Sequence, residues 1–151
     1  MSLENPTPET FNPLVWEIVR QVPRGVVTTF GQLASMIPPP DSVDPADYAR
    51  LGPRWVGDAM NAVSFSDDPT VPWHRVINAR GGISLPPDSR AGKQQRARLE
   101  AEGVVFSKKD LCSLDDYGWD GPSSTWLETH GLRAPKPLRK PADDGGQMRL
   151  F

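Results

Sequence analysis

The amino-acid sequence predicts a mainly helical domain that contains a helix-turn-helix pair and a small β-hairpin or wing. Two observations support this fold class. Apolar residues recur at helical spacing in segments that proline and glycine separate, and the segments with an extended pattern are short. The 151 residues suffice for one domain with a tail.

The first helix is expected after a polar stretch, residues 1–10, that is typical of a flexible N-terminus. Asn12 is a suitable N-cap, and Pro13 suits the first helical position because the N–H that it lacks has no partner there in any case. Apolar residues three or four positions apart continue to Val22, and the Pro-Arg-Gly that follows ends the helix.

The next segments predict the helix-turn-helix pair. Thr29 can cap a helix from Phe30 to Ile37, which three prolines then stop. An Asp-Pro pair predicts a short helix over 45–51. A Gly-Pro pair separates it from a third helix over 54–63, which carries an arginine and small residues. Two short helices after a longer one are typical of a helix-turn-helix arrangement.

The hairpin or wing is expected in the second half of the domain. Residues 71–77 have an extended pattern, residues 78–82 are rich in turn formers, and residues 83–85 predict a return strand. A charged helix over 90–102 ends at a glycine in the position after the C-cap. Residues 104–106 predict a terminal strand.

Charge is unevenly distributed, although the net charge is only -2. Residues 11–109 carry 12 Lys and Arg against 10 Asp and Glu, a net of +2, whereas residues 110–129 carry five acids and no Lys or Arg. A mildly basic domain is weak support for DNA binding. We divide the chain into a flexible N-terminus (1–10), a domain (11–106), an extension packed on it (107–130) and a flexible tail (131–151).

Cysteine and histidine are scarce, which excludes several classes of protein. A single cysteine, Cys112, leaves no internal disulfide, and two histidines are too few for the Cys and His ligands of a structural zinc site. No apolar run approaches the ~18 residues of a membrane span, and no leader pattern opens the chain. We expect a monomer in the cytoplasm, associated with the nucleoid, without metal or cofactor.

Four segments carry a family resemblance, and they occur in a fixed order: residues 22–34, 54–60, 71–77 and 102–104. The third is the most specific and reads Pro72-Trp73-His74-Arg75-Val76. The span from Phe11 to Val105 resembles the DNA-binding domain of the O6-alkylguanine-DNA alkyltransferases, which read Pro-Cys-His-Arg-Val at this point. The resemblance covers about two thirds of the chain.

Trp73 stands where those enzymes carry the cysteine thiolate that accepts the alkyl group. An indole offers an N–H donor and no nucleophile. Cys112 is a poor substitute because it lies outside the matching span, with acidic neighbours Asp110 and Asp115 that disfavour a thiolate. The motif therefore resembles that of the alkyltransferase-like proteins, which bind O6-alkylguanine without removing the lesion.

This resemblance implies minor-groove binding of double-stranded DNA, flipping of the damaged base into a pocket and recruitment of nucleotide excision repair proteins. It implies that Arg54 enters the duplex and fills the gap left by the base. The candidate pocket residues are Trp73, Phe30, Val71, Pro72, Ile83 and Ser84. The candidate DNA contacts are Arg54, Trp55, Gly57, Thr28, Thr29, Gln32 and Ala59.

Several of these residues also have a purely structural interpretation. Phe30 replaces the tyrosine usual in the family, and core packing is an alternative role for its ring. Thr28, Thr29 and Gln32 are expected to hold phosphates through hydroxyls and backbone N–H groups, and simple helix capping is an alternative that does not exclude this role. With no thiol to activate, His74, Arg75 and Glu102 are expected to remain as a structural relay, and no residue is catalytic.

The chain ends in Gln147-Met148-Arg149-Leu150-Phe151, which resembles the Gln-x-x-Leu-Phe peptides that bind the replication sliding clamp in bacteria. Gln147, Leu150 and Phe151 are the candidate clamp contacts, and a chance match is the alternative. Two other functions stay open: an active alkyltransferase with another nucleophile such as Cys112, and a helix-turn-helix transcription regulator.

Overall fold

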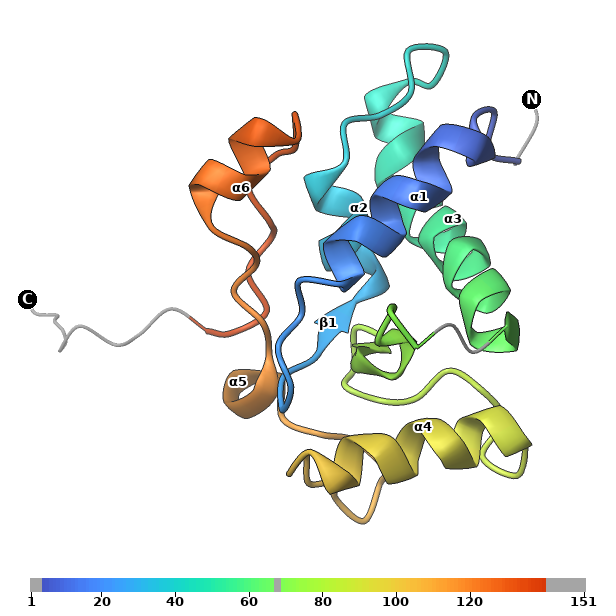
Figure 1. Cartoon of the computed structure of the whole chain (residues 1–151), viewed down its shortest axis with the longest axis vertical. Coiled ribbons are helices and arrows are strands. Elements are labelled where there is room, and N and C mark those ends of the chain that lie inside the picture. The colour runs from blue at the N-terminus through green and yellow to red at the C-terminus, as the bar shows by residue number, and fades with distance from the viewer. Residues whose placement is uncertain (1–3, 67–68, 141–151) are drawn as a thin grey trace, which may run out of the picture.

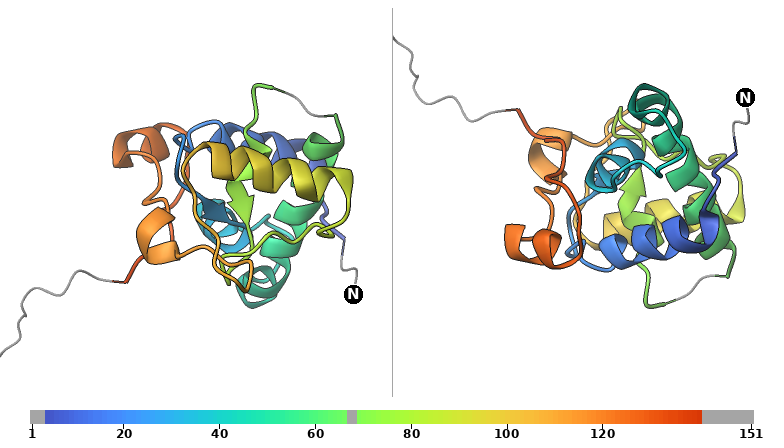
Figure 2. Two further views of the ribbon diagram at one scale, coloured as in Figure 1. Left: turned by 90° about the horizontal axis from the view of Figure 1, so that it is seen from below. Right: turned by 90° about the horizontal axis from the view of Figure 1, so that it is seen from above.

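The computed structural model describes residues 4–66 and 69–140. Helices dominate this part of the chain, which confirms the predicted mainly helical class (Figure 1). In chain order the elements are α1 (Pro8–Val19), β1 (Thr28–Thr29), α2 (Phe30–Met36), α3 (Pro45–Ser66), the 3-10 turn η1 (Trp73–Arg75), β2 (Val76–Ile77), α4 (Arg90–Ala101), α5 (Leu114–Tyr117) and α6 (Ser124–Thr129). Helices α1 to α3 gather on one side of the short strands and α4 lies on the other, with α5 and α6 at one flank (Figures 1 and 2).

Helix α1 begins at Pro8, so the predicted start at Pro13 and the predicted flexible stretch through residue 10 are wrong. Pro8 takes the first-turn position that suits proline. Pro13 lies inside the helix, where it leaves the carbonyl four residues earlier without a helical donor. Packing offsets this loss: Phe11 is 3% exposed, and its ring meets those of Tyr48 and Trp55 edge-on, with centroids 6.4 and 6.2 Å away.

Helices α2 and α3 form the helix-turn-helix pair, but α3 runs unbroken where two helices were predicted. Thr29 caps α2 as expected, its hydroxyl accepting from the N–H of Gln32 at 3.0 Å. Pro53 lies inside α3 instead of opening a new helix. Gly52 accounts for the continuity: a Cβ there would lie 3.2 Å from the Cβ of Ala34, so α2 and α3 pack closely across the proline.

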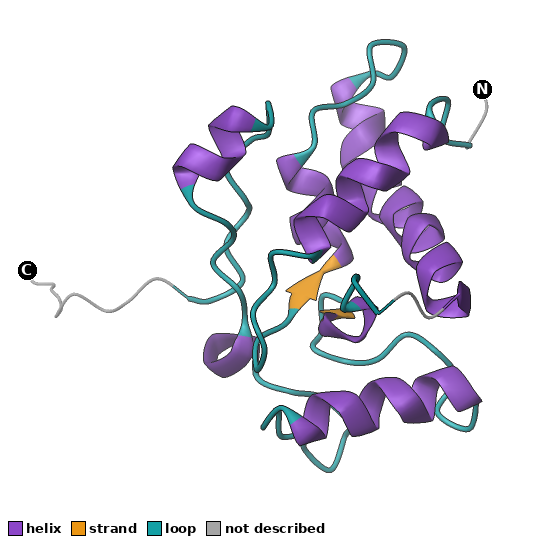
Figure 3. Cartoon of the chain, in the orientation of Figure 1, coloured by secondary structure: helices purple, strands orange, loops and turns teal. Residues whose placement is uncertain are grey.

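The short strands lie between the N-terminal helices and α4 (Figure 3). β1 and β2 run parallel, with Thr28 opposite Val76. Helix α4 matches its prediction at both ends. The hydroxyl of Ser89 accepts from the N–H of Gly92 at 3.0 Å, and Gly103 follows with a φ of +96°, which glycine adopts without strain.

Three segments predicted to be extended have another structure. Residues 73–75 form η1, and neither 83–85 nor 104–106 is a strand, so the predicted hairpin does not form. The small sheet of the predicted fold class is the parallel β1–β2 pair. The turn over 78–82 does form. Its last glycine pairs antiparallel with Leu111, so a later segment takes the place of the predicted return strand.

The acidic segment after α4 packs against the domain. Val27 forms a parallel bridge with Gly118, and Trp119 and Leu127 are buried in the main core with residues of α1 to α3. Apolar anchors at both ends therefore hold this segment in place. None of the helices in the described ranges has the length and apolar character that a bilayer crossing requires.

Residues 131–140 were predicted as part of a flexible tail, but two of them are hydrogen-bonded to α2. The N–H of Arg133 donates to the carbonyl of Met36 at 2.8 Å, and the N–H of Lys136 donates to the hydroxyl of Ser35 at 3.0 Å. The prediction rested on proline and charge content, which does not show that partners on α2 satisfy the backbone.

Candidate functional site

A cavity of about 310 Å³ lies between α2, α3, η1 and the loop that precedes α4. Its walls are mainly apolar, with a few amide and hydroxyl groups among them. The lining residues are Phe30, Gly57, Met60, Asn61, Trp73, Val76, Ser84, Leu85 and Gln95. A small cavity with apolar walls and a few polar groups suits a flat heteroaromatic ligand.

Trp73 forms one wall of this cavity and is held firmly. Its side chain is 3% exposed, and its ring meets that of His74 edge-on at a centroid distance of 6.4 Å. The guanidinium of Arg98 lies 5.3 Å from the centre of the indole. The amide of Gln95 donates to the carbonyls of His74 and Val76 at 3.2 and 2.9 Å, so α4 fixes the backbone within η1 and directly after it.

The carboxylate of Glu102 joins the helix-turn-helix half of the domain to η1. It accepts from Arg75 through Nε at 3.0 Å and Nη2 at 2.7 Å, from His74 Nε2 at 2.8 Å and from the N–H of Gly25 at 3.1 Å. Burial alone would raise the pKa of Glu102, but hydrogen bonds from Arg75, His74 and Gly25 outweigh it and lower that pKa to about 2. The group is therefore a carboxylate at neutral pH.

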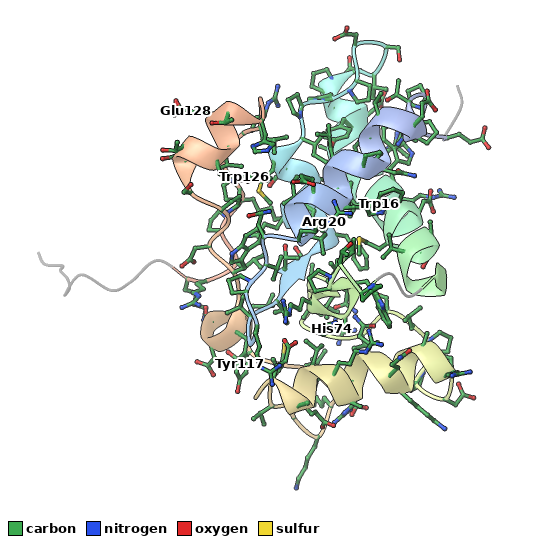
Figure 4. All side chains as sticks on the ribbon, viewed as in Figure 1. Trp16, Arg20, His74, Tyr117, Trp126 and Glu128 are labelled. Atoms are coloured by element: carbon green, nitrogen blue, oxygen red, sulfur yellow. The ribbon has the colours of Figure 1, made fainter. Side chains whose placement is uncertain are left out.

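His74 lies between the sheet and α4 (Figure 4). Burial lowers the pKa of its imidazole, and the hydrogen bond with Glu102 opposes that effect without cancelling it. A neutral ring that donates from Nε2 leaves Nδ1 as an acceptor. This Nδ1 is buried and has no hydrogen-bond partner among the residues that the structure describes. The predicted relay is thus assembled, but no thiol adjoins it.

Cys112 does not adjoin the cavity either. It is 4% exposed and belongs to a second core cluster with Val27, Ile77, Leu99 and Val104. Burial raises the pKa of its thiol, which keeps it protonated at neutral pH. Its position and its protonation both argue against a role as the displaced nucleophile.

The structure brings together three of the six predicted pocket residues: Trp73, Phe30 and Ser84. Ile83 instead lines a neighbouring groove of about 590 Å³. Val71 is buried in the core, and Pro72 is the N-cap of η1; neither lines the cavity. The sequence reasoning missed Met60, Asn61, Val76, Leu85 and Gln95. Met60 and Asn61 were recognisable, since they lie three and four positions after Gly57 on the same helix.

The predicted DNA contacts on α3 divide into two groups. Arg54 is exposed and Gly57 is half-buried and faces Phe30, so both remain accessible. Trp55 and Ala59 are 2% and 0% exposed, and they pack in the core, so their prediction as DNA contacts is wrong. The predicted helix boundary placed Arg54 in a first turn. Because α3 is continuous, Arg54 instead lies in the middle of the helix.

The predicted phosphate contacts at the start of α2 are wrong for the side chains. Thr28, Thr29 and Gln32 are at most 1% exposed. The hydroxyl of Thr28 donates to the side-chain carbonyl of Gln32 at 2.7 Å, while the Gln32 amide donates to the carbonyls of Trp119 and Lys136 at 2.8 and 3.1 Å. Capping is confirmed for Thr29, and phosphate contacts from backbone N–H groups stay a prediction.

Comparison with known proteins shows the family to which this chain belongs. Residues 10–104 match the family model described as 6-O-methylguanine DNA methyltransferase, DNA binding domain, and the chain belongs to this family. It is 35% identical over 113 residues to the DNA base-flipping protein of Escherichia coli K12, covering 74% of this chain and 76% of that protein. It is 36% identical over 118 residues to alkyltransferase-like protein 1 of Schizosaccharomyces pombe, covering 78% and 95%.

A solved structure supports the same assignment. The crystal structure of S. pombe Atl1 in complex with damaged DNA containing O6-carboxymethylguanine superposes with a TM-score of 0.52. Sequence identity is 32%, and the match covers 74% of this chain and 95% of that one. The predicted family resemblance is confirmed, and the relatives include alkyltransferase-like proteins.

Proposed function

We propose that this protein is a non-enzymatic sensor of O6-alkylguanine in duplex DNA, which flips the damaged base into the cavity beside Trp73. One observation carries the proposal. Trp73, which stands where the resembling motif of the alkyltransferases has its cysteine, lines the cavity, and His74, Arg75 and Glu102 contact one another behind it. The pocket is therefore retained and the acceptor of the alkyl group is not.

The cavity suits an extruded base. Phe30 and Trp73 supply flat apolar walls, and Met60 and Leu85 supply apolar contacts for an alkyl substituent. Polar groups of Asn61, Gln95 and Ser84 line the same space. Extrusion costs a few kcal/mol, and less at a damaged pair, so the cavity selects bases that leave the stack easily.

Arg54 is the proposed side chain that fills the vacated position in the duplex. It is exposed on the same helix as Gly57, which lies three positions further on and lines the cavity. A guanidinium stacks on bases with its flat face and donates hydrogen bonds at its edges, so it replaces both stacking and pairing. The DNA base-flipping proteins among the relatives support this step.

Damage recognition without turnover requires a second protein that repairs the lesion. We propose that nucleotide excision repair proteins take this role, in the cytoplasm at the nucleoid. The candidate clamp contacts Gln147, Leu150 and Phe151 lie outside the described residues, and clamp binding stays a proposal from sequence.

The decisive test is a duplex that carries O6-methylguanine with a labelled methyl group. The expected result is tighter binding than to undamaged duplex, with all label left on the DNA after long incubation. Label found on the protein would contradict the proposal and favour an alkyltransferase with another nucleophile. Equal affinity for both duplexes would favour a lesion-independent DNA-binding protein.

A further inference from the structure

Residues 131–140 form a strongly basic segment, here called the basic strap. Its ten residues include Arg133, Lys136, Arg139 and Lys140 and no Asp or Glu. All four cationic side chains belong to exposed residues. The strap lies outside residues 10–104, which the family model matches, so the family domain does not account for it.

Residues 133–136 of the strap are fixed on α2 by hydrogen bonds. Besides the backbone hydrogen bonds to Met36 and Ser35, the carbonyl of Lys136 accepts from the buried Gln32 amide at 3.1 Å. The N–H of Lys140 donates to Asp115 at 2.8 Å at the far end. Because its backbone is held at several points, the strap presents its cations at defined positions and not as a diffuse cloud.

The strap places two cations next to the proposed lesion cavity. The ammonium of Lys136 lies 3.3 Å from the position that a Cβ on Gly31 would take, and Gly31 follows the cavity residue Phe30. Arg133 and Lys136 line a hollow that Pro53 of α3 also lines. Pro53 is one helical turn before Gly57 of the cavity wall, so the hollow and the cavity lie about one turn apart along α3.

These two cations are not neutralised within the described residues: no ion pair involves the side chain of Arg133 or Lys136 there. Arg139 differs, since it donates to the carbonyl of Gly118 at 2.7 Å and lies 3.7 Å from Asp120. Uncompensated cations beside a DNA-binding helix pair attract phosphates.

We propose that the basic strap is a DNA-backbone contact, in which Arg133 and Lys136 bind phosphates of the duplex beside the α2–α3 pair. This inference rests on the proposed function, because it takes the α2–α3 face as the one that meets DNA. Phosphate contacts of this kind hold the protein on duplex DNA without reading its sequence.

The test is the salt dependence of binding to undamaged and O6-methylguanine duplexes, for the full chain and for Arg133→Ala/Lys136→Ala. Each lost phosphate contact should make the slope of log K against log salt shallower by about 0.9 and weaken binding roughly fivefold to tenfold at ~0.1 M salt. The expected loss is the same on both duplexes, so the preference for the lesion stays unchanged.

Two control variants make the result specific. Arg133→Lys/Lys136→Arg keeps both charges and should keep the slope. Lys108→Ala removes one exposed charge from the 107–111 turn, which pairs with Gly82 and not with α2, and should change the slope by much less. Thermal melting of each variant identifies any that fail to fold.

The outcomes separate the two proposals. If the folded double alanine variant has the same salt slope and the same affinity as the parent protein on either duplex, the strap is not a DNA contact. This conclusion does not depend on the preference for the lesion. A parent protein that binds both duplexes equally overturns lesion sensing, while a shallower slope in the variant still supports the strap. A loss confined to the lesion duplex overturns the backbone contact, because phosphates are common to both.

Discussion

Glu102→Gln should destabilise the protein strongly, because one buried carboxylate holds three partners. The Glu102 side chain is 5% exposed and that of Arg75 is 16% exposed. Glutamine keeps the shape of the side chain and removes its charge, so the guanidinium of Arg75 is left without its counter-ion. Breaking a buried pair by changing one partner typically costs about 3–5 kcal/mol.

The pKa of Glu102 gives an independent magnitude. A shift from the ordinary value of 4.5 to about 2 corresponds to about 3 kcal/mol of stability, at 1.36 kcal/mol per pH unit. Because the folded pKa is the lower one, this stability is fully present above the unfolded pKa. It is lost as the pH falls from about 4.5 to about 2.

Urea unfolding at pH 7 and at about pH 2.5 measures both effects. At pH 7 the variant should lose roughly 3 kcal/mol. At low pH most of the difference from the parent should disappear, because the carboxyl group is then protonated in the unfolded parent and the pH lies close to its folded pKa of about 2. Glu128→Gln on α6, an exposed position, is the matched control and should change stability by less than about 0.5 kcal/mol. A loss below about 1 kcal/mol at pH 7, or one that persists at low pH, would refute the reasoning.

Three further predictions concern DNA binding and capping. Arg54→Ala should weaken binding to an O6-methylguanine duplex at fixed salt at least tenfold. Arg50→Ala removes an exposed arginine one turn away and should have a small effect. Equal effects of the two variants in a titration would contradict the gap-filling role of Arg54. Thr29→Ala removes the N-cap of α2 and should cost about 1 kcal/mol in urea unfolding; an unchanged free energy of unfolding would show that the cap contributes no stability. Cys112→Ala should leave lesion affinity unchanged in the same titration, because the thiol lies in the second core cluster; lost binding with an unchanged melting temperature would reopen the case for this cysteine.

Local patterns predicted the elements whose boundaries depend on nearby residues. The hydroxyl of Thr29 and the glycine after Glu102 mark helix ends through contacts within a few positions, and both predictions are confirmed. Pro13 and Pro53 misled the prediction for the opposite reason. Each lies inside a helix whose continuation depends on distant partners, the aromatic cluster of Phe11 in one case and the packing of Gly52 on α2 in the other.

The candidate site was predictable where a motif names it and unpredictable where only packing selects it. The motif identified Trp73 and Phe30, and it linked His74 with Glu102, 28 positions later. Nothing local indicated that Gln95 would line the cavity and brace η1 from α4. The prediction that the Thr28 side chain contacts phosphate is wrong because this side chain is buried, and burial is difficult to predict from a single sequence.

The sequence by itself determined that residue 73 offers an indole N–H and no thiol, which is the basis for proposing recognition without alkyl transfer. Tertiary structure alone decided which side chains can reach DNA. Burial withdrew Trp55 from that surface and left Arg54 exposed on the same helix. The tertiary structure also places the basic strap beside α2, which is about a hundred residues away in the chain. Hydrogen-bond partners and apolar contacts that are distant in sequence meet only in the folded state.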